Sequence, residues 1–313
     1  MSAALGTAPT PHQEIQALIA SVEQVIQGKR DTVELAMVAV IGGGHILLED
    51  VPGVGKTTLA HSLAQALGGS FSRVQFTSDL LPADVLGTLI LEPGSGSLAF
   101  RPGPVFANVV LADEVNRCTP KTQSALLEAM AERRVSVDGQ SHALPDPFLV
   151  VATQNPHDHG GTFPLPDSQL DRFLLRLRMG YPDREAERRV LRSGGFRGAQ
   201  IQPALAPERV ARLIAAAQDI AFHDELEDFL LELVDRTRRD PRFVRGVSTR
   251  GAEALYRATK ALALIRGRSF VIPEDLHTLA LPVLAHRVLP RGEGIVAAER
   301  ALTELLGELP PPA

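Results

Sequence analysis

Residues 50–57, Asp-Val-Pro-Gly-Val-Gly-Lys-Thr, constrain the fold more than any other part of the chain. They lie between a short apolar run, residues 45–49, and a segment whose leucines recur at helical spacing. Backbone N–H groups of a glycine-rich turn and of a helix N-terminus attract an anion, so the segment predicts a phosphate-binding loop. Lys56 would reach the β- and γ-phosphates, and the Thr57 hydroxyl would hold Mg²⁺.

One residue departs from the usual phosphate-loop pattern, which begins with glycine where this chain has Asp50. Because aspartate adopts left-handed backbone more readily than most residues, we expect the turn to survive. The alternative interpretation is a tight strand-to-helix turn with an incidental lysine. The residues expected to bind the nucleotide here are Pro52, Gly53, Val54, Gly55, Lys56, Thr57 and Thr58.

Strand-like and helical segments alternate up to about residue 182. The strands are expected at residues 45–49, 71–76, 108–112, 147–153 and 173–179, which predicts a five-stranded parallel sheet between helices. Two insertions interrupt the plan, one near residues 89–100 and a hairpin near residues 135–144 that turns at Asp-Gly. From residue 183 the periodicity is helical, with no convincing strand. We therefore expect an α/β domain over residues 1–182 and an all-α domain over residues 183–313.

Polar residues follow two of the predicted strands. Asp113 and Glu114 end an apolar strand, and such acids lie beside the phosphate loop in parallel sheets. Asp113 would coordinate Mg²⁺, and Glu114 would polarise the attacking water. Asn155 ends a later strand and would orient that water; the alternative is an ordinary turn residue before Pro156.

Two arginines are further candidates. We expect the last predicted strand to begin at Arg172, and Arg250 falls in the first turn of a predicted helix. A cation in a first turn opposes the helix dipole, so a phosphate is a plausible partner for Arg250. The alternative for each is a solvated surface arginine.

These motifs resemble those of the AAA+ ATPases, and more closely those of the MoxR family. The resemblance covers almost the whole chain, is most specific in residues 45–181, and rests on residues 47–57, 75–84, 100–108, 112–117, 120–130 and 164–173. It implies a P-loop core with a C-terminal helical lid, a helix-2 insert near residues 89–100 and a pre-sensor-1 hairpin near residues 135–144. By this resemblance Lys56 and Thr57 belong to Walker A, Asp113 and Glu114 to Walker B, Asn155 to sensor 1, Arg250 to sensor 2, Arg172 to the arginine finger, and Gly28 to the segment beside adenine.

The resemblance also implies an activity and its partners. ATP and Mg²⁺ would bind between subunits of a ring, commonly a hexamer, and hydrolysis would remodel, mature or activate client proteins, sometimes by metal insertion. A von Willebrand factor A-domain protein is a frequent partner. The alternatives are a nucleic-acid motor and a Mg-chelatase-type subunit. A small-molecule kinase or GTPase is weaker, because no Asn-Lys-x-Asp signature is present.

Composition excludes several other classes. The net charge of −5 argues against a surface made for nucleic acid, and the single cysteine excludes a disulfide framework. No apolar run approaches the ~18 residues that cross a bilayer, so we expect a cytoplasmic protein. His157 and His159 flank Asp158 and could hold a metal, although a solvent-facing loop is the preferred interpretation.

Overall fold

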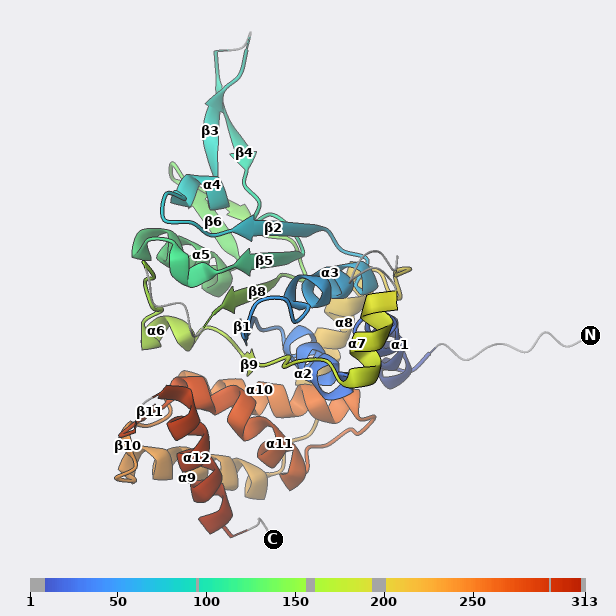
Figure 1. Ribbon diagram of the computed structural model, residues 1–313, viewed down its shortest axis with the longest axis vertical. Helices are drawn as coiled ribbons and strands as arrows, with labels where there is room; N and C mark the ends of the chain where they lie inside the picture. Colours follow the sequence, from blue (N-terminus) through green and yellow to red (C-terminus); the bar gives the residue numbers. More distant parts are fainter. Residues whose placement is uncertain (1–8, 94–95, 156–160, 193–200, 293, 311–313) are drawn as a thin grey trace, which may run out of the picture.

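The computed structural model describes residues 9–93, 96–155, 161–192, 201–292 and 294–310. A sheet with its helices forms the upper part in Figure 1, and a group of helices forms the lower part. The two parts meet where helix α2 (Arg30–Ile41) packs against helix α10 (Thr249–Ile265).

Two helices precede the sheet. Helix α1 (Pro11–Glu23) begins with a capping box, in which the Thr10 backbone N–H donates to Gln13 Oε1 at 2.9 Å and the Gln13 N–H donates to Thr10 Oγ1 at 3.3 Å. Helix α2 begins at Arg30. The apolar faces of both helices are buried in one core.

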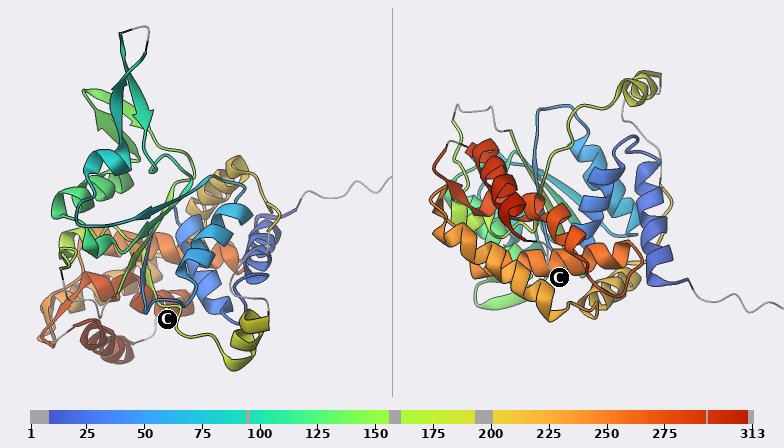
Figure 2. Two further views of the ribbon diagram at one scale, coloured as in Figure 1. Left: turned by 45° about the horizontal axis from the view of Figure 1, so that its top comes forward. Right: turned by 90° about the horizontal axis from the view of Figure 1, so that it is seen from below.

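The predicted five-stranded parallel sheet is confirmed. Its strand order is β2-β5-β8-β1-β9, and its strands are β1 (Ile46–Glu49), β2 (Phe71–Gln75), β5 (Val109–Asp113), β8 (Leu149–Gln154) and β9 (Leu175–Leu177). Successive side chains point to opposite faces of a strand, so Ile46 and Leu48 enter one core and Leu47 enters a second. Helices α1, α2 and α3 (Lys56–Ala66) cover the first face, and α5 (Pro120–Glu132) covers the other (Figure 2).

Both predicted insertions are hairpins. Strands β3 (Gly87–Leu91) and β4 (Leu98–Pro102) follow the short helix α4 (Pro82–Leu86) and project from the top of the molecule in Figure 1. Strands β6 (Arg134–Val137) and β7 (Gln140–Ala143) turn at Asp138 and Gly139, which have φ of 50° and 76°. Two positive φ angles are what a two-residue hairpin loop of this kind requires.

The rest of the chain is mostly helical, as expected. Its longer helices are α7 (Arg184–Arg192), α8 (Pro207–Gln218), α9 (Asp224–Arg239), α10, α11 (Pro273–Leu284) and α12 (Gly294–Glu308). One difference is a small antiparallel pair of β10 (Phe243–Arg245) and β11 (Leu289–Pro290). Strands this short carry no alternating pattern that a sequence could reveal.

Three short elements complete the described chain: the 3₁₀ turns η1 (Val115–Arg117) and η2 (Ala285–Arg287) and the one-turn helix α6 (Asp167–Leu170). Arg172 was expected to open the last strand. It lies instead in the connection between α6 and β9, because β9 begins only at Leu175. Within the described residues no helix is both long and apolar enough to cross a membrane.

Candidate functional site

The phosphate loop joins β1 to α3. Gly53 and Gly55 have φ of 85° and 98°, and Gly55 is the residue before the first helical turn. The backbone N–H groups of that turn have no partner within the helix and are available to an anion. The Lys56 ammonium donates to the backbone oxygen of Asp50 at 2.7 Å, across the loop.

Asp50 does not need the left-handed backbone that we expected of it. It is absent from the described non-glycine residues with positive φ, so no glycine is required at this position. Its carboxylate holds the loop in place instead: Oδ1 accepts from the Val51 N–H at 2.9 Å, and Oδ2 accepts from the Gly180 N–H at 2.6 Å. The side chain thus ties the phosphate loop to the segment that follows β9.

The two acids at the end of β5 are positioned by the neighbouring strand β8. The Thr153 hydroxyl donates to Asp113 Oδ1 at 2.6 Å and accepts from the Glu114 N–H at 2.9 Å. Glu114 has φ of 57°, a left-handed conformation that costs a non-glycine residue about 1–2 kcal/mol. Strain of this kind is concentrated at functional sites.

Strand β2 supplies two partners of these acids that sequence reasoning missed. Arg73 Nη2 donates to Asp113 Oδ2 at 2.7 Å, and Gln75 Nε2 donates to Glu114 Oε2 at 2.9 Å. Arg117 Nη1 also donates to Glu114 Oε2, at 2.9 Å. The alternation of Arg73, buried Val74 and Gln75 shows that the two polar side chains share a face. Only the pairing of β2 with β5, however, brings that face to the acids.

A cavity of about 300 Å³ opens between the loop and the strand ends. It is lined by Pro52, Gly53, Gly55, Lys56, Thr57, Thr58, Arg73, Asp113, Glu114 and Asn155. Partial burial lowers the pKa of Lys56, while the negative charges of Asp113, Asp50 and Glu114 act in the opposite direction. The structure therefore gathers nine of the predicted site residues around one space that holds both cationic and anionic groups.

Four predicted site residues do not line this cavity: Gly28, Val54, Arg172 and Arg250. Val54 is buried in the core. Arg172 donates from Nη1 to the Leu127 backbone oxygen at 2.9 Å, on the flank of α5. The Arg250 side chain is 61% exposed, and its Nη1 lies 3.9 Å from Asp171 Oδ2.

Gly28 lies against residue 183, three positions after the Gly180 that Asp50 holds. A Cβ atom added at Gly28, where φ is 71°, would come within 2.9 Å of Asp183 Oδ2. The neighbouring Lys29 ammonium donates to the Tyr181 backbone oxygen at 2.6 Å. Residues 28–29 and 180–183 therefore form one small unit beside the phosphate loop.

The donor set of the cavity suits Mg²⁺, which prefers oxygen ligands and binds through one or two carboxylates together with substrate phosphates. The Thr57 hydroxyl and the Asp113 carboxylate both face the cavity. The described residues contain no group of three histidine, cysteine, aspartate or glutamate side chains that could hold a metal alone. His157 and His159 lie outside the described residues.

Two family comparisons match the two parts of the structure. The family described as "ATPase family associated with various cellular activities (AAA)" matches residues 45–175, and the family described as "AAA lid domain" matches residues 235–305. The first range contains strands β1, β2, β5 and β8 of the parallel sheet and ends at the first residue of β9, and the second contains helices α10 and α11.

Individual relatives are similar over most of the chain. Chaperone MoxR1 of Mycobacterium tuberculosis is 40% identical over 88% of this chain and 75% of its own length. Protein MoxR of Paracoccus denitrificans is 32% identical over 92% of this chain and 94% of its own. A solved structure from Cytophaga hutchinsonii, described as a putative ATPase, is 36% identical, covers 96% of both chains and superposes with a TM-score of 0.88.

Proposed function

Since the chain belongs to the MoxR family of AAA+ ATPases, we propose that it hydrolyses ATP in a ring assembly and uses the energy to remodel, mature or activate partner proteins. The observation that carries the proposal is the single cavity shared by Lys56, Thr57, Asp113 and Glu114. Phosphoryl transfer needs these same groups: a cradle for the phosphates, a metal ligand, and a residue that directs water.

The loop binds the triphosphate in this proposal. Backbone N–H groups from Gly53 to Thr58 cradle the phosphate oxygens, and the Lys56 ammonium leaves the Asp50 backbone oxygen to meet the β- and γ-phosphates. Thr57 and Asp113 would hold Mg²⁺, which neutralises charge on the phosphates when bound. Arg73 must then release Asp113 Oδ2, because the guanidinium occupies that oxygen.

Glu114 acts as the base in this proposal. Its Oε2 accepts hydrogen bonds from Gln75 and Arg117, which fix the position of the carboxylate. Both donors act on Oε2, and the attacking water would give its proton to the same carboxylate. Asn155 lines the same cavity and would orient that water.

Arg172 and Arg250 complete the site only after assembly and domain movement. Arg172 lies outside the cavity of its own chain, which suits a residue that serves a neighbouring subunit's nucleotide. Arg250 lies at the start of α10, in the helical part, and would reach the γ-phosphate when that part rotates about a hinge near Pro182. Gly28 would lie beside adenine.

The reaction is tested with Glu114→Gln, which keeps the shape of the side chain and removes its basicity. We expect ATP binding to persist and hydrolysis to fall by about 100-fold or more, the usual contribution of a general base. Glu132→Gln is the matched control, because Glu132 is exposed at the end of α5 and does not line the cavity. Unchanged turnover in Glu114→Gln would overturn the role assigned to Glu114.

The client is sought with the same variant. With ATP bound but not hydrolysed, the Glu114→Gln ring should retain its partner, and a pull-down would identify it. The MoxR resemblance favours a von Willebrand factor A-domain protein as a separate polypeptide. Equal recovery of a protein by Lys56→Ala, which cannot hold the triphosphate, would show that its capture does not depend on the nucleotide state.

A further inference from the structure

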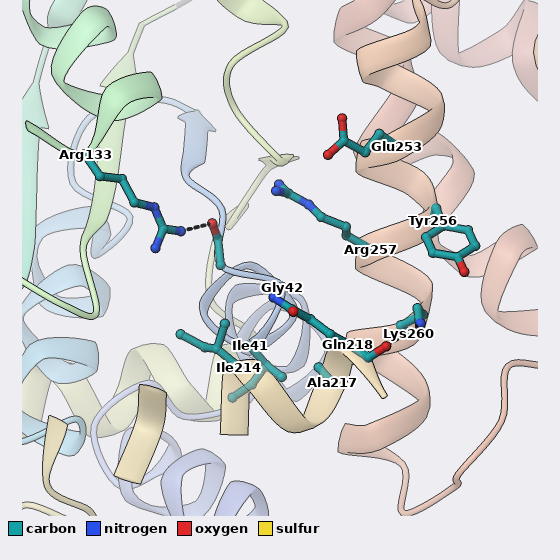
Figure 3. A pocket seen from close by; sticks show the side chains of 11 residues that line it. Ile41, Gly42, Arg133, Ile214, Ala217, Gln218, Glu253, Tyr256, Arg257 and Lys260 are labelled. Atoms are coloured by element: carbon teal, nitrogen blue, oxygen red, sulfur yellow. Dashed lines mark hydrogen bonds between the residues drawn. The ribbon is translucent and has the colours of Figure 1, made fainter. Parts of the chain in front are cut away.

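A second cavity, of about 570 Å³, lies away from the phosphate loop. It opens between the end of α2, the end of α5 and helices α8 and α10 (Figure 3). Its floor is apolar and is formed by Ile41, Ile214 and Ala217. Pockets of this size, apolar with a few placed polar groups, are typical of sites for small molecules.

Positive charge dominates the rim. Arg133, Arg257 and Lys260 line the cavity, and Glu253 is the one carboxylate among its described lining residues. Figure 3 shows the Arg133 and Arg257 guanidinium groups reaching into the space from opposite walls. Both side chains are exposed, and an anion between two facing cations would be attracted by both of them.

Arg257 has no acidic partner among the described residues. Its guanidinium forms no hydrogen bond or ion pair with any of them, Glu253 included, and its side chain is exposed to water. Desolvation lowers the pKa of Arg257; Glu253 opposes this effect, and the charge of Arg133 adds to it. These five N–H donors are thus free to bind an oxyanion.

A hydrogen bond to Gly43 holds the Arg133 side chain, and the backbone of Arg133 is strained. It has φ of 51°, in the left-handed region, and its Nη2 donates to the Gly43 backbone oxygen at 2.8 Å. A Cβ atom at Gly43 would lie 3.3 Å from that same nitrogen, so glycine allows the close approach. Asp146 lies 3.9 Å from Nη1, and both side chains are exposed. Arg133 is nevertheless one of the residues that line the cavity.

We propose that this cavity binds a small molecule with a phosphate or carboxylate group, which lies between Arg133 and Arg257, and an apolar body, which packs on Ile41 and Ile214. Planar guanidinium groups bind such oxyanions through paired hydrogen bonds. The ligand would touch both the sheet part and α10, which begins at the predicted sensor 2 residue. It would therefore oppose rotation of one part against the other.

Binding is measured by calorimetry on the full chain, with the nucleotide site filled by a non-hydrolysable ATP analogue and Mg²⁺. The probes are phenyl phosphate and benzoate, which separate the two oxyanions, and phenol is the uncharged control. We expect at least one anion to bind and phenol not to bind. Soaked crystals should show the anion between the two arginines.

Variants place the site. Arg257→Gln and Arg133→Gln should each weaken binding by about tenfold or more, the usual effect of losing a charge-assisted hydrogen bond. Arg212→Gln removes the same charge from an exposed position on α8 that does not line the cavity, and should bind as the wild type does.

Three results would overturn the proposal: no binding of either anion, equal affinity in Arg257→Gln and wild type, or equal binding of phenol. An oligomer that weakens in Arg257→Gln, with no anion bound by the wild type, would assign the cavity to an acidic side chain of a second copy instead.

Discussion

Arg287 is a buried cation, and Asp171 supplies the negative charge that compensates it. The Arg287 side chain is 2% exposed, and its Nε donates to Asp171 Oδ1 at 2.8 Å. Burial lowers the pKa of Arg287 to about 10, and Asp171 opposes that fall. Removing the negative charge leaves the guanidinium buried and uncompensated, which costs about 3–5 kcal/mol for a fully buried pair.

We expect the stability cost of Asp171→Asn to be at the low end of that range. Backbone oxygens also accept from the guanidinium, among them those of Phe173 at 2.6 Å and Leu174 at 3.2 Å, and they remain in the variant. The asparagine side chain would also keep one oxygen acceptor, and Asp171 is 15% exposed, so water screens part of the charge. We expect the free energy of unfolding to fall by about 3 kcal/mol.

Urea unfolding followed by circular dichroism measures the loss. The control is Asp235→Asn, which breaks an exposed pair with Arg239 on α9, and should cost less than about 0.5 kcal/mol. If Asp171→Asn destabilises no more than this control does, the assigned role of the buried pair is wrong. Ser248, the N-cap of α10, donates to Asp171 Oδ2 at 2.9 Å, so the same variant would loosen α10 from the segment that carries Arg172.

Two further predictions concern acid stability and assembly. Burial lowers the pKa of His45 to about 4. Between pH 6.5 and 4 the unfolded chain therefore binds a proton at this residue that the folded chain does not bind. The free energy of unfolding falls as the pH drops through this range. Over this pH range the free energy of unfolding of His45→Gln should fall by about 3 kcal/mol less than that of the wild type, as measured by unfolding at each pH. His223 is exposed, so the free energy of unfolding of the control His223→Gln should fall as much as that of the wild type. Arg172→Ala should bind ATP but fail to hydrolyse it. In rings that mix the variant with the wild type, the ATPase rate should fall by more than the fraction of variant subunits. A rate that falls only in proportion to that fraction would refute a role of Arg172 in a neighbouring site.

Local features of the chain could be predicted because neighbouring residues produce them. The turn at Asp138 and the phosphate loop each lie within a few residues, and the chemistry of those residues sets the backbone. The five strands followed from apolar runs separated by helical periods. The sequence by itself therefore determined the fold class and nine of the ten residues that line the cavity beside the phosphate loop.

The contacts that hold the site together join residues that are far apart in the chain. Asp50 meets Gly180 across 130 positions, Arg73 meets Asp113 across 40, and Arg287 meets Asp171 across 116. Which side chains meet is set by the strand order and by how the helical part docks, and no period in the sequence encodes either. Only the tertiary structure shows that Asp50 connects the phosphate loop to Gly180, and that Arg133 and Arg257 line the same cavity from opposite sides.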